Sequence, residues 1–409
     1  MKQKTVLMKT IERLRLVYLS LILLLLSAAI SCQSDKPGRL KTISYESCLA
    51  SKRAMHLSDI ADTLIYLELK APEDIVVTRV WKVRWIDDRW IVHSFAGVMA
   101  FSEDGTYLTT YGRKGGGPGE YTMISDFEVD TEKKELVMLD SHQLIYYDLD
   151  GHYLRSAICD EHTFKIGISH SVVWGCTISH RTTRDRAVAF DAHGDSLTSI
   201  PNPFYMAPCI DEGMGFSTSK YWASFHTCQD MLYMKTMEDN DTLYQVQGGK
   251  AIPYLLFDMG KYKQPMELQA WYCYEDFLHK SYKYWNIPSV LADERYYYLT
   301  AQRCTDPDGD NYKYKESNFH YILYDKELDE GFVTDGPEGT RFTDDLLGGP
   351  AFWPRWDVGA YFVNTIEWHE MKQFVEEEKL TLSPDLQKQC DEWDDDTNAL
   401  LILARKKHK

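Results

Sequence analysis

Short runs in which hydrophobic and polar residues alternate follow one another along most of the chain, and turn-forming residues separate them. Two successive groups of four such runs cover residues 80–85, 90–93, 98–101 and 106–110, and then residues 126–130, 135–140, 143–148 and 152–156. A period of two predicts β-strands, and the tight turns between the runs predict antiparallel pairing. Four short antiparallel strands form one blade of a β-propeller, so each group predicts a blade.

A ten-residue motif repeats through these groups and supports this interpretation. Met99–Leu108 aligns with Ile145–Leu154, and more weakly with Val188–Leu197. Each copy carries a glycine at the same turn position, and these glycines lie 46 and then 43 residues apart: Gly105, Gly151 and Gly194. This spacing is close to the roughly 40–50 residues of a propeller blade.

Later strand groups complete the expected architecture. They lie within residues 221–257, 295–334 and 359–404, and segments with a helical pattern interrupt them at 266–282 and 367–393. In the second segment, Ser383 followed by Pro384 predicts a helix N-terminus. These insertions either pack against the side of the ring or form a lid or a partner surface. We predict an all-β fold: a six-bladed β-propeller with four-stranded antiparallel blades and small helical insertions.

The two ends of such a ring must be joined, because an open blade edge promotes aggregation. An N-terminal strand can complete the last blade by pairing with the final strand of the chain. We therefore predict that Thr63–Leu67 pairs beside Ala399–Ala404.

Tyr111–Tyr121 holds five glycines and two cations, a composition that resembles a phosphate-binding loop. It has no Lys-Ser/Thr pair, and Glu120 stands where the third glycine of a dinucleotide fingerprint belongs after Gly115 and Gly117. A strand pattern follows it, whereas a phosphate loop precedes a helix. We therefore predict that the run forms the corner between the outer strand of one blade and the inner strand of the next.

The N-terminus has the pattern of an export signal. Scattered cations precede the apolar run Leu16–Ile30, which at about fifteen residues is shorter than the roughly twenty of a membrane span. Leu26–Cys32 resembles a bacterial lipobox, which predicts a lipid on Cys32; an ordinary secretory signal with an incidental cysteine is the alternative. The expected organisation is a signal peptide at 1–31, a tether at 32–56 and the propeller at 57–409. We expect an exported protein held by lipid in the cell envelope, on the periplasmic or surface side of the outer membrane.

Charge and cysteine content narrow the function classes. The formal net charge is −17, which disfavours nucleic-acid binding because the surface repels phosphate backbones. The nine cysteines are widely spread without a CxxC pair, so neither a zinc site nor a disulfide scaffold is indicated. We expect mostly free, buried cysteines, no metal and no cofactor.

Several segments resemble known proteins. Gly112–Tyr121 and the later Ile145–Gly151 resemble the NHL-type repeat. The mature chain as a whole is similar to the six-bladed β-propeller lipoproteins common in Bacteroides-like bacteria, and this similarity is carried by Leu57–Leu67, Asn240–Tyr244, Leu347–Pro354 and Asp396–Leu403. The resemblance implies the propeller fold and an envelope location, and it implies no particular activity.

Ligands of propellers usually bind at the central channel or on the loops of one face. The candidate ligand-binding residues lie at or just before the starts of the inner strands: Asp126, His162, Lys165, Tyr284, Trp285, Phe352, Trp353 and Arg355. Their aromatic rings suit stacking on sugars, with Arg355 and Asp126 supplying polar contacts. The alternative for the aromatic residues is that they wedge neighbouring blades together.

Two functions remain open at this level. The chain lacks a recognisable catalytic motif, which favours a non-catalytic module that binds a glycan, a peptide or an envelope protein partner. The alternative is a polysaccharide lyase or glycosidase acting in the channel, which needs converging carboxylates that sequence spacing does not reveal.

Overall fold

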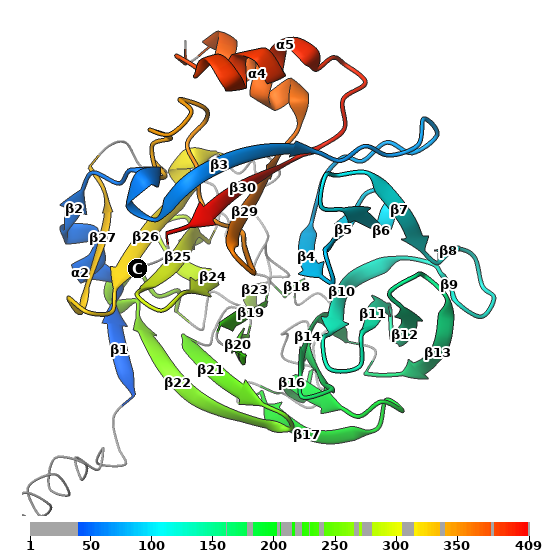
Figure 1. Cartoon of the computed structure of the whole chain (residues 1–409). Helices are drawn as coiled ribbons and strands as arrows, with labels where there is room; N and C mark the ends of the chain where they lie inside the picture. Colours follow the sequence, from blue (N-terminus) through cyan, green and yellow to red (C-terminus); the bar gives the residue numbers. More distant parts are fainter. Residues whose placement is uncertain are drawn as a thin grey trace, which may run out of the picture. The chain divides into compact units, whose positions relative to one another are not determined.

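The computed structural model describes residues 40–160, 162–177, 183–202, 205, 215–216, 223–228, 230–236, 241–265, 270–271, 280–304, 315–335, 340–377 and 380–407. Six small antiparallel sheets within Thr42–Lys409 surround a common centre and form a six-bladed β-propeller (Figure 1). The predicted fold class is confirmed.

Blades 1 to 3 follow one another along the chain, each as a simple four-stranded meander. Blade 1 consists of β4 (Lys82–Ile86), β5 (Arg89–Ser94), β6 (Gly97–Ser102) and β7 (Tyr107–Tyr111). Blade 2 consists of β10 (Ile124–Asp130), β11 (Glu135–Asp140), β12 (Gln143–Asp148) and β13 (Tyr153–Ile158). Blade 3 consists of β14 (Thr163–Ser169), β15 (Val172–Thr177), β16 (Asp185–Phe190) and β17 (Ser196–Pro201). In every blade the strand named first, here and in the next paragraph, lies nearest the centre and is called the inner strand.

Blades 4 to 6 have the same plan with additions. Blade 4 consists of β19 (Ser224–Cys228), β20 (Met231–Lys235), β21 (Thr242–Gln247) and β22 (Lys250–Asp258). Blade 5 consists of β24 (Trp285–Ala292), β25 (Tyr296–Arg303), β26 (Phe319–Asp325) and β27 (Glu330–Thr334). Blade 6 takes β28 (Trp356–Val358), β29 (Tyr361–Ile366) and β30 (Leu400–Lys406) from the C-terminal part and β3 (Ala61–Glu68) from the N-terminal part.

The pairing of β3 with β30 closes the ring as predicted. The two strands are antiparallel, and Leu64 lies opposite Ala404 in their register. β3 is the outermost strand of blade 6, so hydrogen bonds between the two ends of the chain hold the last blade together.

Residues 41–60 add a strand to each of two more blades. β1 (Lys41–Ser44) adds a fifth strand outside β22, and β2 (Lys52–Arg53) pairs in parallel with β27. The helix α2 (Tyr45–Ala50) lies between them, and the short 3-10 helix η1 (Leu57–Asp59) precedes β3. The sequence predicts a tether at 32–56. The part of it that follows Leu40 is folded instead, because Ile43, Tyr45 and Cys48 bury their side chains in the core of blades 4 and 5. We call residues 41–60 the N-terminal strap.

Each interface between neighbouring blades in the described structure contains a hydrophobic cluster. Tyr111 of blade 1 packs with Phe127 of blade 2, for example, whereas Trp174 of blade 3 packs with Met234 of blade 4. The period-two pattern places one set of alternate side chains toward each neighbour, which is why both faces of the central strands are apolar.

The repeated turn glycines are joints between blades. Gly105 and Gly194 have φ angles of 81° and 86°, a conformation that favours glycine. A Cβ atom on either would lie 2.0 Å from a carbonyl oxygen in the outer strand of the preceding blade, that of Glu68 or of Ile158. The motif thus repeats because each turn must meet the neighbouring blade closely.

The glycine-rich run forms the predicted corner between β7 and β10. Two short strands, β8 (Arg113–Lys114) and β9 (Glu120–Tyr121), pair in parallel within it. Glu120 closes the loop by accepting hydrogen bonds from the Gly117 amide and the Arg113 guanidinium. The Tyr147 hydroxyl donates to the Gly119 carbonyl and fixes the corner to blade 2.

The helix pair predicted at 367–393 is confirmed. α4 (Trp368–Glu377) and α5 (Pro384–Glu392) connect β29 to β30, and the Ser383 hydroxyl caps α5 as predicted. Met371 and Leu386 join the hydrophobic cluster of blades 5 and 6, which supports the packing alternative. Most of the other helical prediction, 266–282, lies outside the described residues. Within it, Ala270–Trp271 is not helical and forms β23, because its backbone pairs with β18 (Gly215–Phe216).

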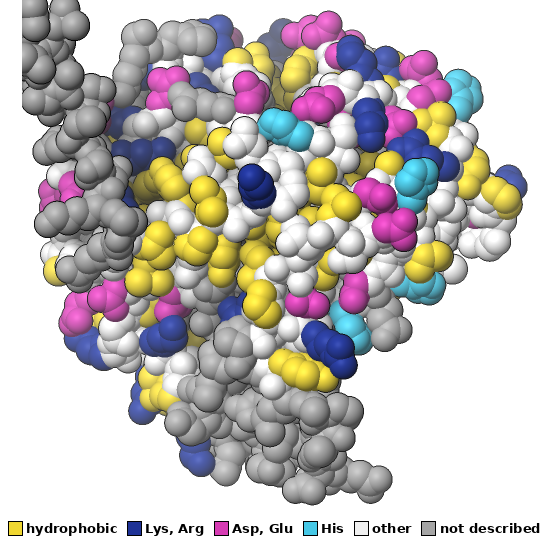
Figure 2. All heavy atoms as spheres, turned by 90° about the horizontal axis from the view of Figure 1, so that it is seen from below, with side chains coloured by type: hydrophobic (Ala, Val, Ile, Leu, Met, Phe, Trp, Pro, Cys, Tyr) yellow, Lys and Arg dark blue, Asp and Glu magenta, His cyan; other side chains and the backbone are white. Residues whose placement is uncertain are grey.

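Acidic, basic and apolar side chains are interspersed on the described part of the edge formed by β17 and β22 (Figure 2).

The described cysteines are free, and all but Cys228 are buried, in agreement with the expectation; Cys32, Cys209 and Cys273 lie outside the described residues. None of the described helices is long and apolar enough to cross a bilayer.

Candidate functional site

A pocket of about 1290 Å³ lies where the inner strands end. We call this side of the ring the end face and the opposite side, where the inner strands begin, the start face. All six blades contribute to the pocket, through the last residues of their inner strands and the turns that follow them. Its wall includes Trp85, Glu128, Ser169, His226, Leu291 and Trp356, one from each inner strand.

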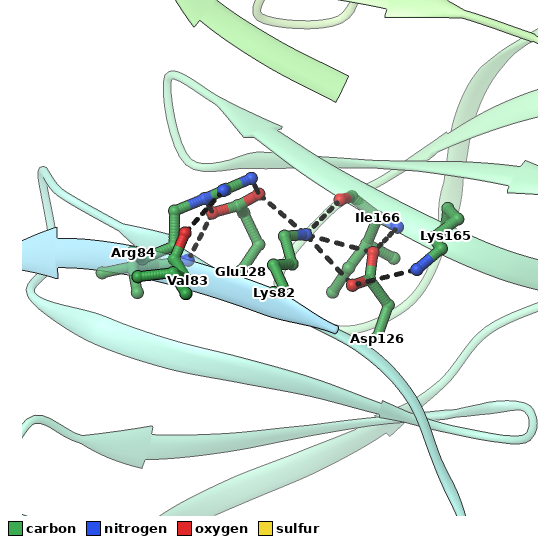
Figure 3. A network of polar contacts seen from close by, with 8 residues as sticks. Lys82, Val83, Arg84, Asp126, Glu128, Lys165 and Ile166 are labelled. Atoms are coloured by element: carbon green, nitrogen blue, oxygen red, sulfur yellow. Dashed lines mark hydrogen bonds and ion pairs between the residues drawn. The ribbon is translucent and has the colours of Figure 1, made fainter. Parts of the chain in front are cut away.

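A buried ionic network extends from this pocket toward the start face across blades 1 to 3 (Figure 3). On the pocket side, the Arg84 guanidinium donates to both oxygens of Glu128 at 2.5 and 2.6 Å. Lys82 Nζ lies 3.1 Å from Glu128 Oε2 and donates to both oxygens of Asp126 at 3.1 Å. Lys165 Nζ approaches the same Asp126 at 3.7 Å. The inner strands of three blades are thereby linked through their charges.

The charges in this network stabilise one another. Burial lowers the pKa of Lys82, although Asp126 and Glu128 oppose that effect. Burial alone would raise the pKa of Asp126, but Lys165, Lys82 and the Ile166 amide hold it below its ordinary value. Asp126 therefore stays ionised. Its carboxylate oxygens already contact the Ile166 amide and the ammonium groups of Lys82 and Lys165.

The opposite wall of the pocket carries a second ionic pair, between Asp357 of β28 and Lys406 of β30. Lys406 also donates to the Gly359 carbonyl at 2.9 Å. Burial raises the pKa of Asp357 to about 6, and the nearby Asp293 adds to this effect while Lys406 opposes it. Asp357 is thus a carboxyl group that takes up a proton near neutral pH.

The wall formed by blade 4 contains a neutral histidine. His226 Nε2 lies 2.7 Å from the Ala292 carbonyl, so this nitrogen carries the proton. Burial lowers the pKa of His226 to about 4, which keeps the ring uncharged at neutral pH. Cys228, on the same strand, also lines the pocket, and burial raises the pKa of its thiol.

Aromatic rings line the pocket beside these polar groups. Trp85 and Trp356 come from the neighbouring inner strands of blades 1 and 6, and Tyr296 comes from blade 5. The Arg355 guanidinium lies 4.4 Å from the centre of the Trp356 ring and donates to the Thr365 hydroxyl at 3.2 Å. All three rings are only partly buried, so they can contact a ligand.

The sequence-predicted site residues occupy four different environments. Arg355 lines the pocket. Asp126 and Lys165 lie close together, but they form part of the ionic network behind the pocket wall. His162 and Tyr284 are half-buried and lie outside the pocket lining.

The remaining predicted aromatic residues are packed between blades. Trp285 stacks on His320 with ring centres 3.9 Å apart, in the core of blades 4 and 5. Phe352 and Trp353 are 1% and 3% exposed in the core of blades 5 and 6. Their environment matches the alternative that the sequence left open, in which such rings wedge the blades together.

Sequence reasoning missed the pairing in the ionic network, although the sequence contains a signal for it. Lys82 and Asp126 are 44 residues apart, and so are Arg84 and Glu128. This separation is two residues shorter than the 46 between Gly105 and Gly151, so overlaying the inner strands of blades 1 and 2 with a shift of two residues places Lys-x-Arg beside Asp-x-Glu. The turn residues Glu132, Asp230 and Glu294, which line the pocket, were also missed. Among the described residues, no three His, Cys, Asp or Glu side chains converge as metal ligands would.

Comparison with known proteins assigns the chain to a family. Residues 40–405 match the family described as "Domain of unknown function (DUF4934)". The chain belongs to this family. The DUF4934 match covers the strap and all six blades, from just before β1 to within β30. No curated protein matches the sequence.

Solved structures show related folds. A protein from Bacteroides fragilis NCTC 9343, assigned as exported, is 17% identical to this DUF4934 protein and has a TM-score of 0.67, with 90% of this chain and 100% of that chain covered. A member of the DUF4221 family from Bacteroides vulgatus ATCC 8482 is 11% identical with a TM-score of 0.48, with 85% and 98% covered. At such identities the likeness concerns the fold alone.

Proposed function

We propose that this DUF4934 protein is a non-catalytic binding module of the bacterial cell envelope, which takes a glycan, a peptide or part of a partner protein into the pocket of the end face. The observation that carries the proposal is the pocket itself. Its volume of about 1290 Å³ exceeds the roughly 300–1,000 Å³ of ordinary small-molecule sites, and residues from all six blades line it, with charged and aromatic side chains among them.

The wall is suited to binding because its own polar groups hold one another in place. The Arg84–Glu128 pair and the Lys406–Asp357 pair join side chains of the protein itself. A ligand therefore meets side chains that are already oriented, which reduces the entropy lost on binding.

Export and lipid attachment at Cys32 form the second part of the proposal. The signal pattern at 1–31 supports it, and the related structure from Bacteroides fragilis is also assigned as exported. Changing Cys32 to Ser should move the protein from the membrane fraction to the soluble fraction of the envelope, as measured by fractionation and immunoblotting. If the C32S protein stays in the membrane fraction, the lipid is not the anchor.

The ligand is best sought by thermal shift on the purified full-length protein in mild detergent, with panels of envelope glycans and synthetic peptides. A pocket ligand should raise the melting temperature of the wild type and lose most of this effect in Arg355→Ala and Trp356→Ala. Trp81→Ala is the matched control, since Trp81 is an exposed tryptophan that does not line the pocket. The proposal is contradicted if no compound acts, or if the pocket variants respond like the wild type.

One observation favours the alternative, a glycosidase or polysaccharide lyase. Asp357 lines the pocket, and burial raises its pKa to about 6, an effect to which the charge of Asp293 adds. A carboxyl group tuned in this way can act as a general acid near neutral pH. Release of reducing ends from an envelope polysaccharide by the wild type, and its loss in Asp357→Asn, would favour this enzyme. Activity that persists in the variant would exclude Asp357 as the acid.

A further inference from the structure

The mouth of the pocket carries acidic side chains from separate parts of the ring. Asp59 comes from η1, and Glu132, Asp230 and Glu294 come from the turns after the inner strands of blades 2, 4 and 5. All four are exposed. We propose that the pocket binds a basic peptide segment whose lysine or arginine side chains are distributed among these carboxylates. This inference rests on the proposed function, because it names the ligand of the same pocket.

Three of the five basic side chains of the wall are paired with carboxylates of the protein. Arg84 pairs with Glu128, and Lys406 pairs with Asp357. Arg295 donates two hydrogen bonds to Asp325 at 3.0 and 2.8 Å. The wall contains seven Asp or Glu and five Lys or Arg residues, so the field inside the mouth attracts cations and repels anions.

The interior of the pocket suits the side chains of a basic peptide. Trp85, Trp356 and Tyr296 offer ring faces, which attract ammonium and guanidinium groups. The contact between Arg355 and Trp356 is an example of this interaction already present in the wall. The same rings can cover the apolar stems of lysine and arginine while the charged ends reach the carboxylates.

The arrangement of the acids favours an extended chain over a single small amine. One ammonium group can reach one or two carboxylates at once, whereas these carboxylates belong to three different blades and the strap. The pocket volume also leaves room for several amino-acid residues. A segment with two or more spaced cations uses both features.

Fluorescence anisotropy with a labelled octapeptide of alternating glycine and lysine tests this inference on the purified full-length protein. The lysine peptide should bind, and its affinity should fall as salt is raised, because the carboxylates are exposed and screened. An octapeptide of alternating glycine and glutamate should not bind. Unlabelled spermidine, as a competitor, distinguishes a peptide from a small polyamine as the preferred cation.

Two triple variants remove the same number of charges from different places. Glu132→Gln with Asp230→Asn and Glu294→Gln neutralises the mouth and should weaken lysine-peptide binding at least tenfold. Asp88→Asn with Glu103→Gln and Asp395→Asn neutralises exposed acids outside the pocket lining and should change affinity less than twofold. Equal weakening in both would show general attraction to an acidic surface and overturn the inference.

The other outcomes separate this inference from the proposed function. If a glycan or an acidic peptide binds in the pocket and the lysine peptide does not, the inference fails and the binding function stands. If spermidine competes at concentrations equal to the peptide's own, a small polyamine replaces the peptide as ligand. If no ligand depends on Arg355 and Trp356, both proposals fail.

Discussion

Blades 1 to 3 differ from blades 4 to 6 in what holds their strands in place. In blades 1 to 3, glycine turns seat each hairpin against the preceding blade, and ion pairs link the inner strands at the centre. In blades 4 to 6, the N-terminal strap adds β1 and β2 to outer edges, β3 completes the last blade, and large aromatic residues fill the interfaces.

The difference shows that one architecture can be stabilised locally or by distant segments. A regular blade needs only its own turns and its neighbours, so its sequence repeats. A blade that receives a strand from elsewhere needs no such repeat, and the motif accordingly fades after Val188–Leu197. Disruption of each half should therefore have distinct consequences.

The largest expected effect is on the half that depends on the strap. Removing Leu400–Lys409 deletes β30, the partner of both β29 and β3, so blade 6 cannot form and the ring stays open. The truncated protein should lack a cooperative unfolding transition in circular dichroism or calorimetry. The control is a variant that lacks only His408 and Lys409. If the protein without Leu400–Lys409 melts like this control, the β3–β30 pair does not hold the ring closed.

A large effect is also expected at the centre of blades 1 to 3. Changing Asp126 to Leu removes the carboxylate shared by buried Lys82 and partly buried Lys165, and loss of one buried partner typically costs about 3–5 kcal/mol. Denaturant unfolding measures this cost. Asp87→Asn breaks an exposed pair with Lys134 and should cost about 1 kcal/mol or less. Equal costs would mean that the network adds little.

Acid should destabilise both halves through their buried histidines. The pKa values of His93 in blade 1 and His226 in blade 4 are lowered by burial to about 4. Between pH 6.5 and 4 the unfolded chain gains protons that these folded side chains do not, so stability is lost as pH falls. Each contributes a loss of roughly 2–3 kcal/mol between pH 7 and 4.5.

Asp357 has the opposite sign, because its raised pKa adds stability as pH falls through about 6. The free energy of unfolding of the wild type should nevertheless be lower at pH 4.5 than at pH 7. The fall should be smaller in His93→Gln and in His226→Gln, and larger in Asp357→Asn. A pH dependence that none of these variants changes would place its origin elsewhere.

A moderate effect is expected at a blade joint. Changing Gly194 to Ala places a methyl group against the Ile158 carbonyl and forces a left-handed backbone conformation, for a cost of roughly 2 kcal/mol or more. Gly116 is the matched control, since a Cβ there meets no atom within 4 Å. Gly116→Ala should shift stability by less than about 0.5 kcal/mol. Similar melting temperatures for both variants would show that the close contact between Gly194 and the Ile158 carbonyl does not require glycine.

The smallest expected effect tests how the strap is attached to blade 5. Tyr45 Oη lies 2.6 Å from His320 Nδ1, and Tyr45→Phe removes this hydrogen bond while keeping the ring in the core. The cost should be about 1 kcal/mol. Tyr153→Phe, which alters an exposed hydroxyl on β13, should be nearly neutral. Urea titrations of both variants distinguish these outcomes.

The sequence predicts the fold well because the relevant signals are local. Gly105, Gly151 and Gly194 mark turns through their own backbone requirements, and alternation marks each strand. Even the long-range pair of β3 and β30 follows from the need to close a ring. These features depend on the chain's own chemistry and on topology.

The site is predicted less well because it depends on which end of each inner strand faces a cavity. Trp285 and Trp353 sit in aromatic-rich stretches that look alike whether they face a ligand or a neighbouring blade. Arg355 reaches the pocket because β28 has only three residues, so its start lies near its end. Glu132 and Asp230 look like ordinary turn residues until the ring brings them to one opening.

The pairing of β3 with β30 also determines when the propeller can close during synthesis. The ribosome makes β3 before its partner β30, which begins only at Leu400. Until then the free edge of β3 can pair with another nascent chain. Pairing between such distant segments also makes folding slow. Cells making this protein should therefore depend on factors that keep the chain from aggregating until β30 is available.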